Sequence, residues 1–250
     1  MSPRTQKAPA ATGASTKRDV PATVAAVLAQ LERRGSRRNR DGMARYAIPS
    51  DRAFGVSMKD VQALGKALGR DHALALALWD TGRYEARALC AYVDEPERVT
   101  PAQMDRWCRD FDNWATCDTL CFSLFDRTPH AWRKVAAWTK RKPEFERRAG
   151  LALLASLALH DKAAEDARFV ALLPLVERVA DDERNFVRKA ASWALRSIGG
   201  RSAALNARVI ALARQLAASD DRTARATGKE VLHELAKPAV QRRLARNAKR

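Results

Sequence analysis

The stretch DDERNFVRKAASWALRSIG, residues 181–199, decides how the chain is expected to fold. Acidic residues precede the start of a helix, where the helix dipole favours negative charge, and Gly199 stands where the helix should end. The small apolar residues between them recur at helical spacing and form one packing face: Val187, Ala190, Ala191, Ala194 and Ile198. Residues 220–232 have a similar layout. Both segments are therefore interpreted as second helices of HEAT-type repeats, whose stacking builds a curved solenoid.

The composition of the whole chain favours an all-α protein. Apolar residues make up 46% of its 250 residues, Ala and Leu dominate, and no alternating strand pattern of useful length occurs. Helical segments of about 10 to 15 residues joined by short turns recur toward the C-terminus. We predict a curved solenoid of degenerate HEAT-like repeats over residues 19–236, a disordered basic tail over residues 1–18 and a basic extension over residues 237–250.

Two local predictions concern the N-terminal third of the chain. A helix is expected from Pro21 to the boundary at Gly35, and Ser57 is expected to cap the helix that follows a loop. The arginines at positions 37, 38 and 40 are expected in a loop, either as phosphate ligands or as a solvated charge run.

A carboxylate interrupts an aromatic stripe between Trp107 and Phe125. Read at helical spacing, the residues on or near one face are Trp107, Phe111, Trp114, Asp118, Cys121, Phe122 and Phe125. Burying an unpaired charge is costly, so a paired or functional carboxylate is expected at Asp118. The alternative is a partly exposed Asp at the edge of the core, or a helix cap near a kink.

Positive charge is concentrated at the two ends of the sequence. The chain has 46 Lys and Arg against 29 Asp and Glu, a net charge of +17. Residues 1–60 carry 12 basic against 5 acidic side chains and residues 131–250 carry 26 against 13, whereas residues 61–130 carry 8 against 11. Such an excess on a helical protein points to a polyanion, and we expect nucleic acid, bound through phosphate contacts. A generally basic proteome or a preference for membrane surfaces is the alternative.

Other classes of protein find less support in the sequence. Four cysteines are too few for a disulfide framework and are interpreted as small core residues, although Cys117 and Cys121 stand one turn apart, a spacing that could also suit a metal. We expect no metal and no cofactor. No apolar run approaches the roughly 20 residues that span a membrane, and the N-terminus has no apolar leader. A cytoplasmic protein is therefore expected, nucleoid-associated when bound to DNA.

Four short motifs give the chain a family resemblance. They are Tyr46 followed by FGVS at residues 54–57, WATCD at residues 114–118, ERRA at residues 146–149 and RKAASW at residues 188–193. In this order and at these intervals they resemble the AlkD-like DNA alkylation-repair glycosylases, over roughly residues 20–235. That family is built from HEAT-like repeats, so the resemblance implies the same fold as the repeat pattern does.

The resemblance also implies roles for individual residues. Residues matching the family's cleft for the sugar of the lesion are the predicted catalytic residues: Asp118, Trp114 and Trp193. The predicted DNA-binding residues that the resemblance implies are Arg148, or adjacent Arg147, and Tyr46. Arg188 and Lys189 lie beside Trp193 on a basic helix face and are also predicted to bind DNA. One position departs from the family, because its motif often has an acidic residue where this chain has Ala115. Related members that lack catalytic cleft residues bind DNA without cutting it.

The implied chemistry suits these residue types. An N3- or N7-alkylated purine is already positively charged and leaves without being protonated, so positive charge develops on the deoxyribose as the bond breaks. We expect a fixed carboxylate at Asp118 to stabilise that charge and to orient water, and the indole rings to add cation–π stabilisation. The resemblance further implies that the base need not be flipped into a pocket, unlike in most glycosylases. The alternatives are a noncatalytic HEAT-repeat protein that binds damaged, bent or branched DNA, and a helical protein-interaction scaffold.

Overall fold

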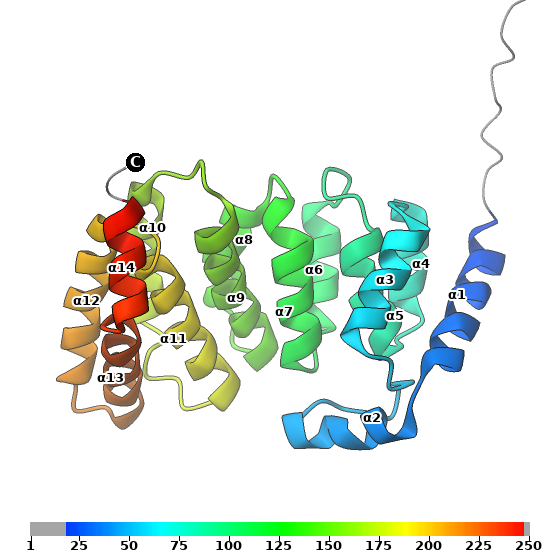
Figure 1. The fold of residues 1–250 in the computed structure, drawn as a ribbon, viewed down its shortest axis with the longest axis horizontal. Helices are drawn as coiled ribbons and strands as arrows, with labels where there is room; N and C mark the ends of the chain where they lie inside the picture. The colour runs from blue at the N-terminus through cyan, green and yellow to red at the C-terminus, as the bar shows by residue number, and fades with distance from the viewer. Residues whose placement is uncertain (1–18, 248–250) are drawn as a thin grey trace, which may run out of the picture.

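A computed structural model describes residues 19–247, and these residues form fourteen α-helices and two short 3-10 helices, with no strand among them (Figure 1). The tail predicted over residues 1–18 lies outside the described residues. In chain order the elements are α1 (Val20–Arg34), α2 (Arg37–Gly42), η1 (Met43–Tyr46), α3 (Met58–Leu68), α4 (His72–Asp80), α5 (Tyr84–Val93), α6 (Pro101–Arg109), α7 (Trp114–Ser123), η2 (Phe125–Arg127), α8 (Ala131–Thr139), α9 (Glu144–His160), α10 (Asp166–Glu177), α11 (Asn185–Gly199), α12 (Ala203–Ala217), α13 (Arg222–Leu235) and α14 (Pro238–Asn247).

The helices stack in two layers along one axis. In one layer α5 packs on α7, α7 on α9, α9 on α11 and α11 on α13, and we call this row the inner layer. Behind it α8 packs on α10 and α10 on α12, while α4, α8 and α12 also pack on α5, α9 and α13 of the inner layer. Figure 1 shows the helices standing side by side along the length of the molecule. The predicted all-α solenoid is confirmed.

Small residues allow the helices of the two layers to approach closely. The apolar face predicted on α11 is buried completely: Val187, Ala190, Ala191, Ala194 and Ile198 are 0% exposed. On α9, a Cβ added to Gly150 would lie 2.5 Å from the backbone nitrogen of Thr139 on α8. Since no side chain fits in that gap, Gly150 sets how closely α8 and α9 pack.

The aromatic stripe of residues 107–125 is divided between two helices. α6 ends at Arg109, and the side chain of Asn113 accepts a hydrogen bond from the backbone N–H of Thr116 at 2.9 Å, which caps the start of α7. Asp and Asn favour such turns and caps over helix interiors because their side chains bond nearby backbone groups. Trp107 and Phe125 are core residues at 0% exposure. Trp114 instead opens a new helix at the edge of the core.

The arginine run at residues 37–40 belongs to a helix and not to the loop expected from the sequence. The hydroxyl of Ser36 accepts from the N–H of Asn39 and starts α2, which lies across the ends of the neighbouring helices (Figure 1). Two hydrogen bonds to the carbonyl of Gly55, from Ser36 N–H at 3.2 Å and from the Asn39 amide at 3.1 Å, tie α2 to the loop before α3. Ser57 caps α3, as predicted.

The C-terminal extension is also helical where it is described. α14 packs on α13, and Leu244 is 4% exposed. The amide of Gln241 donates to the carbonyl of Leu235 at 2.7 Å, which joins the two helices. Across residues 19–247, no helix combines the length and the apolar character needed to cross a membrane.

Candidate active site

A pocket of about 410 Å³ opens where three inner-layer helices meet η1. α7, α9 and α11 contribute to its floor and sides, and the residues at the end of η1 form another wall. Its lining residues are Arg45, Tyr46, Ala47, Trp114, Asp118, Arg148, Asn185, Phe186 and Lys189. We call this cavity the Asp118 pocket. It brings together five residues that the sequence predicted as site residues, although they come from four elements of the chain.

An ion pair between Asp118 and Arg148 forms the floor of the Asp118 pocket. Arg148 donates to Asp118 through two parallel hydrogen bonds, from Nε to Oδ1 at 2.9 Å and from Nη2 to Oδ2 at 2.6 Å. The third guanidinium nitrogen, Nη1, donates to the backbone carbonyl of Phe186 at 2.6 Å. This two-pronged geometry fixes the carboxylate plane and links α7, α9 and α11.

Burial and pairing act in opposite directions on Asp118. Burial raises the pKa of the Asp118 carboxyl and the Arg148 charge lowers it, with a raised pKa as the net result. For Arg148, burial lowers the pKa and the charge of Asp118 raises it, and the pKa is raised overall. The guanidinium therefore keeps its proton, and the pair is a fixed cation beside a carboxylate that binds protons more readily than an exposed Asp.

Arg148, the predicted contact for the DNA backbone, is buried in the floor of the pocket. Its residue surface is 5% exposed, and all three of its guanidinium nitrogens donate within the protein, so a phosphate would have to displace one of these bonds. The exposed cations at the pocket are Arg45 and Lys189. Lys189 was a predicted DNA-binding residue, whereas Arg45 was missed although it directly precedes Tyr46.

Trp114 joins the pocket to the N-terminal part of the chain. Its indole Nε1–H donates to the backbone carbonyl of Tyr46 at 2.7 Å, and its ring packs against a small cluster of Met43, Ile48 and Ala53. The side chain of Tyr46 projects outward and is 65% exposed. This arrangement presents one indole and one phenol at the opening of the pocket.

The comparisons with known proteins agree with this architecture. The family model of the DNA alkylation repair enzymes matches residues 27–235. The chain belongs to this family. A solved structure described as "a new family of proteins related to the HEAT-like repeat DNA glycosylases with affinity for branched DNA structures" superposes with a TM-score of 0.69 at 17% identity, covering 83% of this chain and 93% of that one. At this identity the likeness shows a shared HEAT-like fold.

Two further comparisons concern a designed protein and the curated proteins. A designed armadillo repeat protein in complex with the peptide (KR)4 is similar at 10% identity with a TM-score of 0.31, covering 76% of this chain and 80% of that one. No curated protein matches the sequence.

Trp193, the second indole that the family resemblance placed in the cleft, is not among the residues lining the Asp118 pocket. It lies one turn beyond Lys189 on α11 and stacks on Phe122, with ring centroids 6.1 Å apart and an interplanar angle of 24°. Phe122 itself lies one turn beyond Asp118 on α7. Phe186 is the aromatic residue of α11 that lines the pocket, and no sequence motif had singled it out.

The two remaining predicted DNA-binding residues, Arg147 and Arg188, are engaged in ion pairs outside the pocket. Arg147 donates to Asp182 at 2.7 Å and to the carbonyl of Arg141 at 2.9 Å. Arg188 donates to Glu230 on α13 at 3.2 Å. The adjacent arginines of α9 therefore have different partners, because Arg148 donates to Asp118 and Arg147 donates to Asp182.

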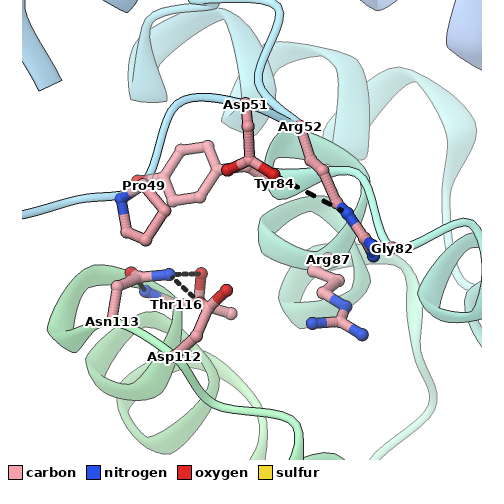
Figure 2. Close-up of a pocket in the computed structure, with 9 residues that line it drawn as sticks. All are labelled: Pro49, Asp51, Arg52, Gly82, Tyr84, Arg87, Asp112, Asn113 and Thr116. Carbon is pink, nitrogen blue, oxygen red and sulfur yellow. Dashed lines mark hydrogen bonds and ion pairs between the residues drawn. The ribbon is translucent and has the colours of Figure 1, made fainter.

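A second pocket of about 320 Å³ lies beside the first turn of α7 (Figure 2). Its lining residues are Pro49, Asp51, Arg52, Gly82, Tyr84, Arg87, Asp112, Asn113 and Thr116. Figure 2 shows the Asn113 amide turned toward Asp112 and Thr116, to which it donates at 2.7 and 3.2 Å. These bonds fix the start of α7 and, with it, the position of Trp114.

The described residues hold no cluster of potential metal ligands. Across residues 19–247, no three His, Cys, Asp or Glu side chains come together as a metal site would require. The two cysteines one turn apart on α7, Cys117 and Cys121, are both buried, and burial raises the pKa of the Cys121 thiol well above its usual range. Buried thiols of this kind act as small apolar core groups.

Proposed function

We propose that this family member is a DNA glycosylase that hydrolyses the N-glycosidic bond of positively charged N3- or N7-alkylated purines in duplex DNA and leaves an abasic site. The observation that carries the proposal is the Asp118 carboxylate, which lies beside Trp114 in an open pocket and is held in one orientation by Arg148. A fixed negative charge next to an aromatic face suits a sugar on which positive charge develops.

The reaction needs little from the protein besides electrostatic stabilisation. The alkylated base carries a positive charge, so it takes the electron pair of the C1′–N bond and leaves as a neutral molecule without receiving a proton. The deoxyribose is left as an oxocarbenium-like cation, and water adds to C1′ and releases a proton. Because the base needs neither protonation by an acid nor recognition of its edges by the protein, it need not be flipped into a pocket of its own.

Arg148 leaves Asp118 able to interact with the sugar. Each carboxylate oxygen has two lone-pair sites, and each oxygen of Asp118 gives one of them to Arg148. One site per oxygen remains for the attacking water or for the positively charged sugar. The pairing with Arg148 holds Asp118 in one orientation, so its role is to stabilise the cation and to orient water.

The surroundings of Asp118 supply the remaining contacts. The Trp114 indole offers an aromatic face to the sugar, and Phe186 provides a second aromatic wall from α11. Arg45 and Lys189 are exposed at the pocket and are placed to bind phosphates on either side of the lesion. The net charge of +17 favours association with DNA over a larger area.

A noncatalytic DNA-binding protein is the second candidate. Both oxygens of Asp118 already bond to Arg148, an arrangement that also serves as a plain structural ion pair. The similar solved structure is described as having affinity for branched DNA structures, and it shares the fold of this chain. A protein of this kind binds duplex or branched DNA with a steep salt dependence but releases no base.

The test is release of 7-methylguanine or 3-methyladenine from methylated duplex DNA. We expect the wild type to release base and Asp118→Asn to lose about 100-fold or more of the rate, with DNA affinity retained. Asp51→Asn is the matched control, because that carboxylate is 75% exposed and lies in the other pocket. Circular dichroism melts show whether each variant is folded.

Each outcome decides between the candidates. Equal rates for wild type and folded Asp118→Asn would remove Asp118 from the chemistry. Salt-dependent DNA binding without any base release in the wild type would favour the noncatalytic protein. DNA affinity that does not change with salt would exclude both and favour a protein-interaction scaffold.

A further inference from the structure

A buried carboxylate outside the Asp118 pocket holds a partly exposed histidine. The side chain of Asp126 on η2 is 0% exposed, and its Oδ2 accepts from the hydroxyl of Ser156 at 2.6 Å. The same oxygen lies 2.5 Å from Nδ1 of His160, the last residue of α9. The other oxygen, Oδ1, is buried and has no hydrogen-bond partner in the described part of the chain.

The buried carboxylate of Asp126 has His160 as its ion-pair partner. A buried carboxylate without a compensating charge is costly. Among residues 19–247, His160 is the one basic side chain within ion-pair distance of Asp126. Because Nδ1 faces the carboxylate, the proton on that nitrogen is fixed by Asp126, and Nε2 is the nitrogen left for another partner. The His160 side chain is 39% exposed.

The rings of Phe122 and Trp193, which we call the aromatic ledge, lie between His160 and the candidate active site. The rings of Phe122 and His160 pack edge to face, with their centroids 4.2 Å apart. The Phe122 ring also stacks on the ring of the half-buried Trp193. Phe122 belongs to α7 and Trp193 to α11, the helices that pack on either side of α9. Their rings therefore meet across α9, on the layer that also carries Asp118, Arg148 and Lys189.

We propose that His160, held in place by its contact with Asp126, is a second contact for the DNA backbone. Its Nε2–H donates to a phosphate oxygen, while the ledge of Phe122 and Trp193 packs against the adjoining deoxyribose. The inference rests on the proposed binding of DNA by the inner layer, and it extends the contact surface from the Asp118 pocket toward the C-terminal ends of α7 and α9. A plain structural tie between η2 and α9 would leave DNA binding unchanged.

The first experiment measures affinity for an unmodified duplex over a series of salt concentrations at pH 6.0, where imidazoles are largely protonated. We expect His160→Gln to reduce the slope of log affinity against log salt by about 0.9, the value for one phosphate contact. His130→Gln, at the residue before α8 in the layer behind the inner layer, is the matched control and should keep the wild-type slope. An unchanged slope in folded His160→Gln would overturn the proposal.

A second measurement uses the wild-type protein and does not depend on how the variant folds. Diethylpyrocarbonate modifies exposed imidazole nitrogens, and mass spectrometry reports the extent at each histidine. We expect the duplex to protect His160 and to leave the reactivity of the half-buried His130 unchanged. Equal modification of His160 with and without bound DNA would contradict the contact. A wild type that shows no salt-dependent DNA binding would instead refute the proposed function itself.

Discussion

The indole N–H of Trp114 donates to the backbone carbonyl of Tyr46 at 2.7 Å, across 68 positions of sequence. This bond joins α7 of the solenoid to the end of η1, so one side chain both lines the Asp118 pocket and holds its opposite wall. The backbone after Tyr46 is strained, because Ala47 has a φ of 53° in the left-handed region. The contacts made by Trp114 help to maintain that conformation.

Trp114→Phe tests this double role. The substitution keeps an aromatic face at the pocket but removes the hydrogen bond, so we expect a loss of stability of about 1 kcal/mol and faster hydrogen exchange in residues 43–48. Base release should fall more than DNA affinity does. Trp132→Phe is the control, since Trp132 also donates from Nε1, to Asp161 at 3.0 Å, away from the pocket. Unchanged exchange in residues 43–48 would show that Trp114 does not hold this wall.

Arg148→Lys should separate charge from geometry at the floor of the pocket. Lysine retains the positive charge but lacks the planar fork that makes two parallel bonds to Asp118. We expect base release to fall by roughly tenfold or more, because the carboxylate loses its fixed orientation. Arg147→Lys alters the neighbouring ion pair with Asp182 and should retain base release. Equal losses in the two variants, both folded, would indicate a general effect on α9.

Local sequence signals predicted the helices well and the pocket in part. The small-residue face of α11 and the cap at Ser57 follow from side-chain size and hydrogen bonding between neighbours in sequence, and both are present as predicted. The break between α6 and α7 was missed because the aromatic spacing continued through it, although Asn113 was a readable cap.

The contacts that Arg148 and Trp193 make depend on tertiary packing, which residue spacing alone does not reveal. The motif placed Arg148 near the site, yet its burial against Asp118 follows from how α7 and α9 pack. Trp193 turns toward Phe122 because their rings meet across α9. Arg45 and Phe186 carried no signal of their own and became candidates only when the chain placed them in the pocket.

The exposed cations of the pocket should contribute to DNA affinity individually. Arg45→Ala and Lys189→Ala each remove one charge at the opening, so we expect each to reduce the slope of log affinity against log salt by about 0.9. Arg208→Ala, on an exposed position of α12, is the control and should leave the slope unchanged. A slope that stays at the wild-type value in both pocket variants would place the phosphate contacts elsewhere on the chain.

Acid should weaken the junction between α9 and the loop before α11, where Arg147 pairs with Asp182. Burial raises the pKa of Asp182, but hydrogen bonds from Arg184 and Arg147 lower it by more, so the pKa falls to about 2. A depressed pKa in the folded state contributes stability that is present above the unfolded value of about 3.9 and is lost as the pH falls toward 2.

We therefore expect Asp182→Asn to lower the free energy of unfolding by ~2 kcal/mol at pH 7, with the difference from wild type shrinking between pH 4 and pH 2. Urea melts at several pH values measure it. Asp51→Asn is the control, since an exposed carboxylate of this kind should cost little at any pH. A difference for Asp182→Asn that stays constant down to pH 2 would mean that the lost hydrogen bonds, and not the charge of Asp182, stabilise this junction.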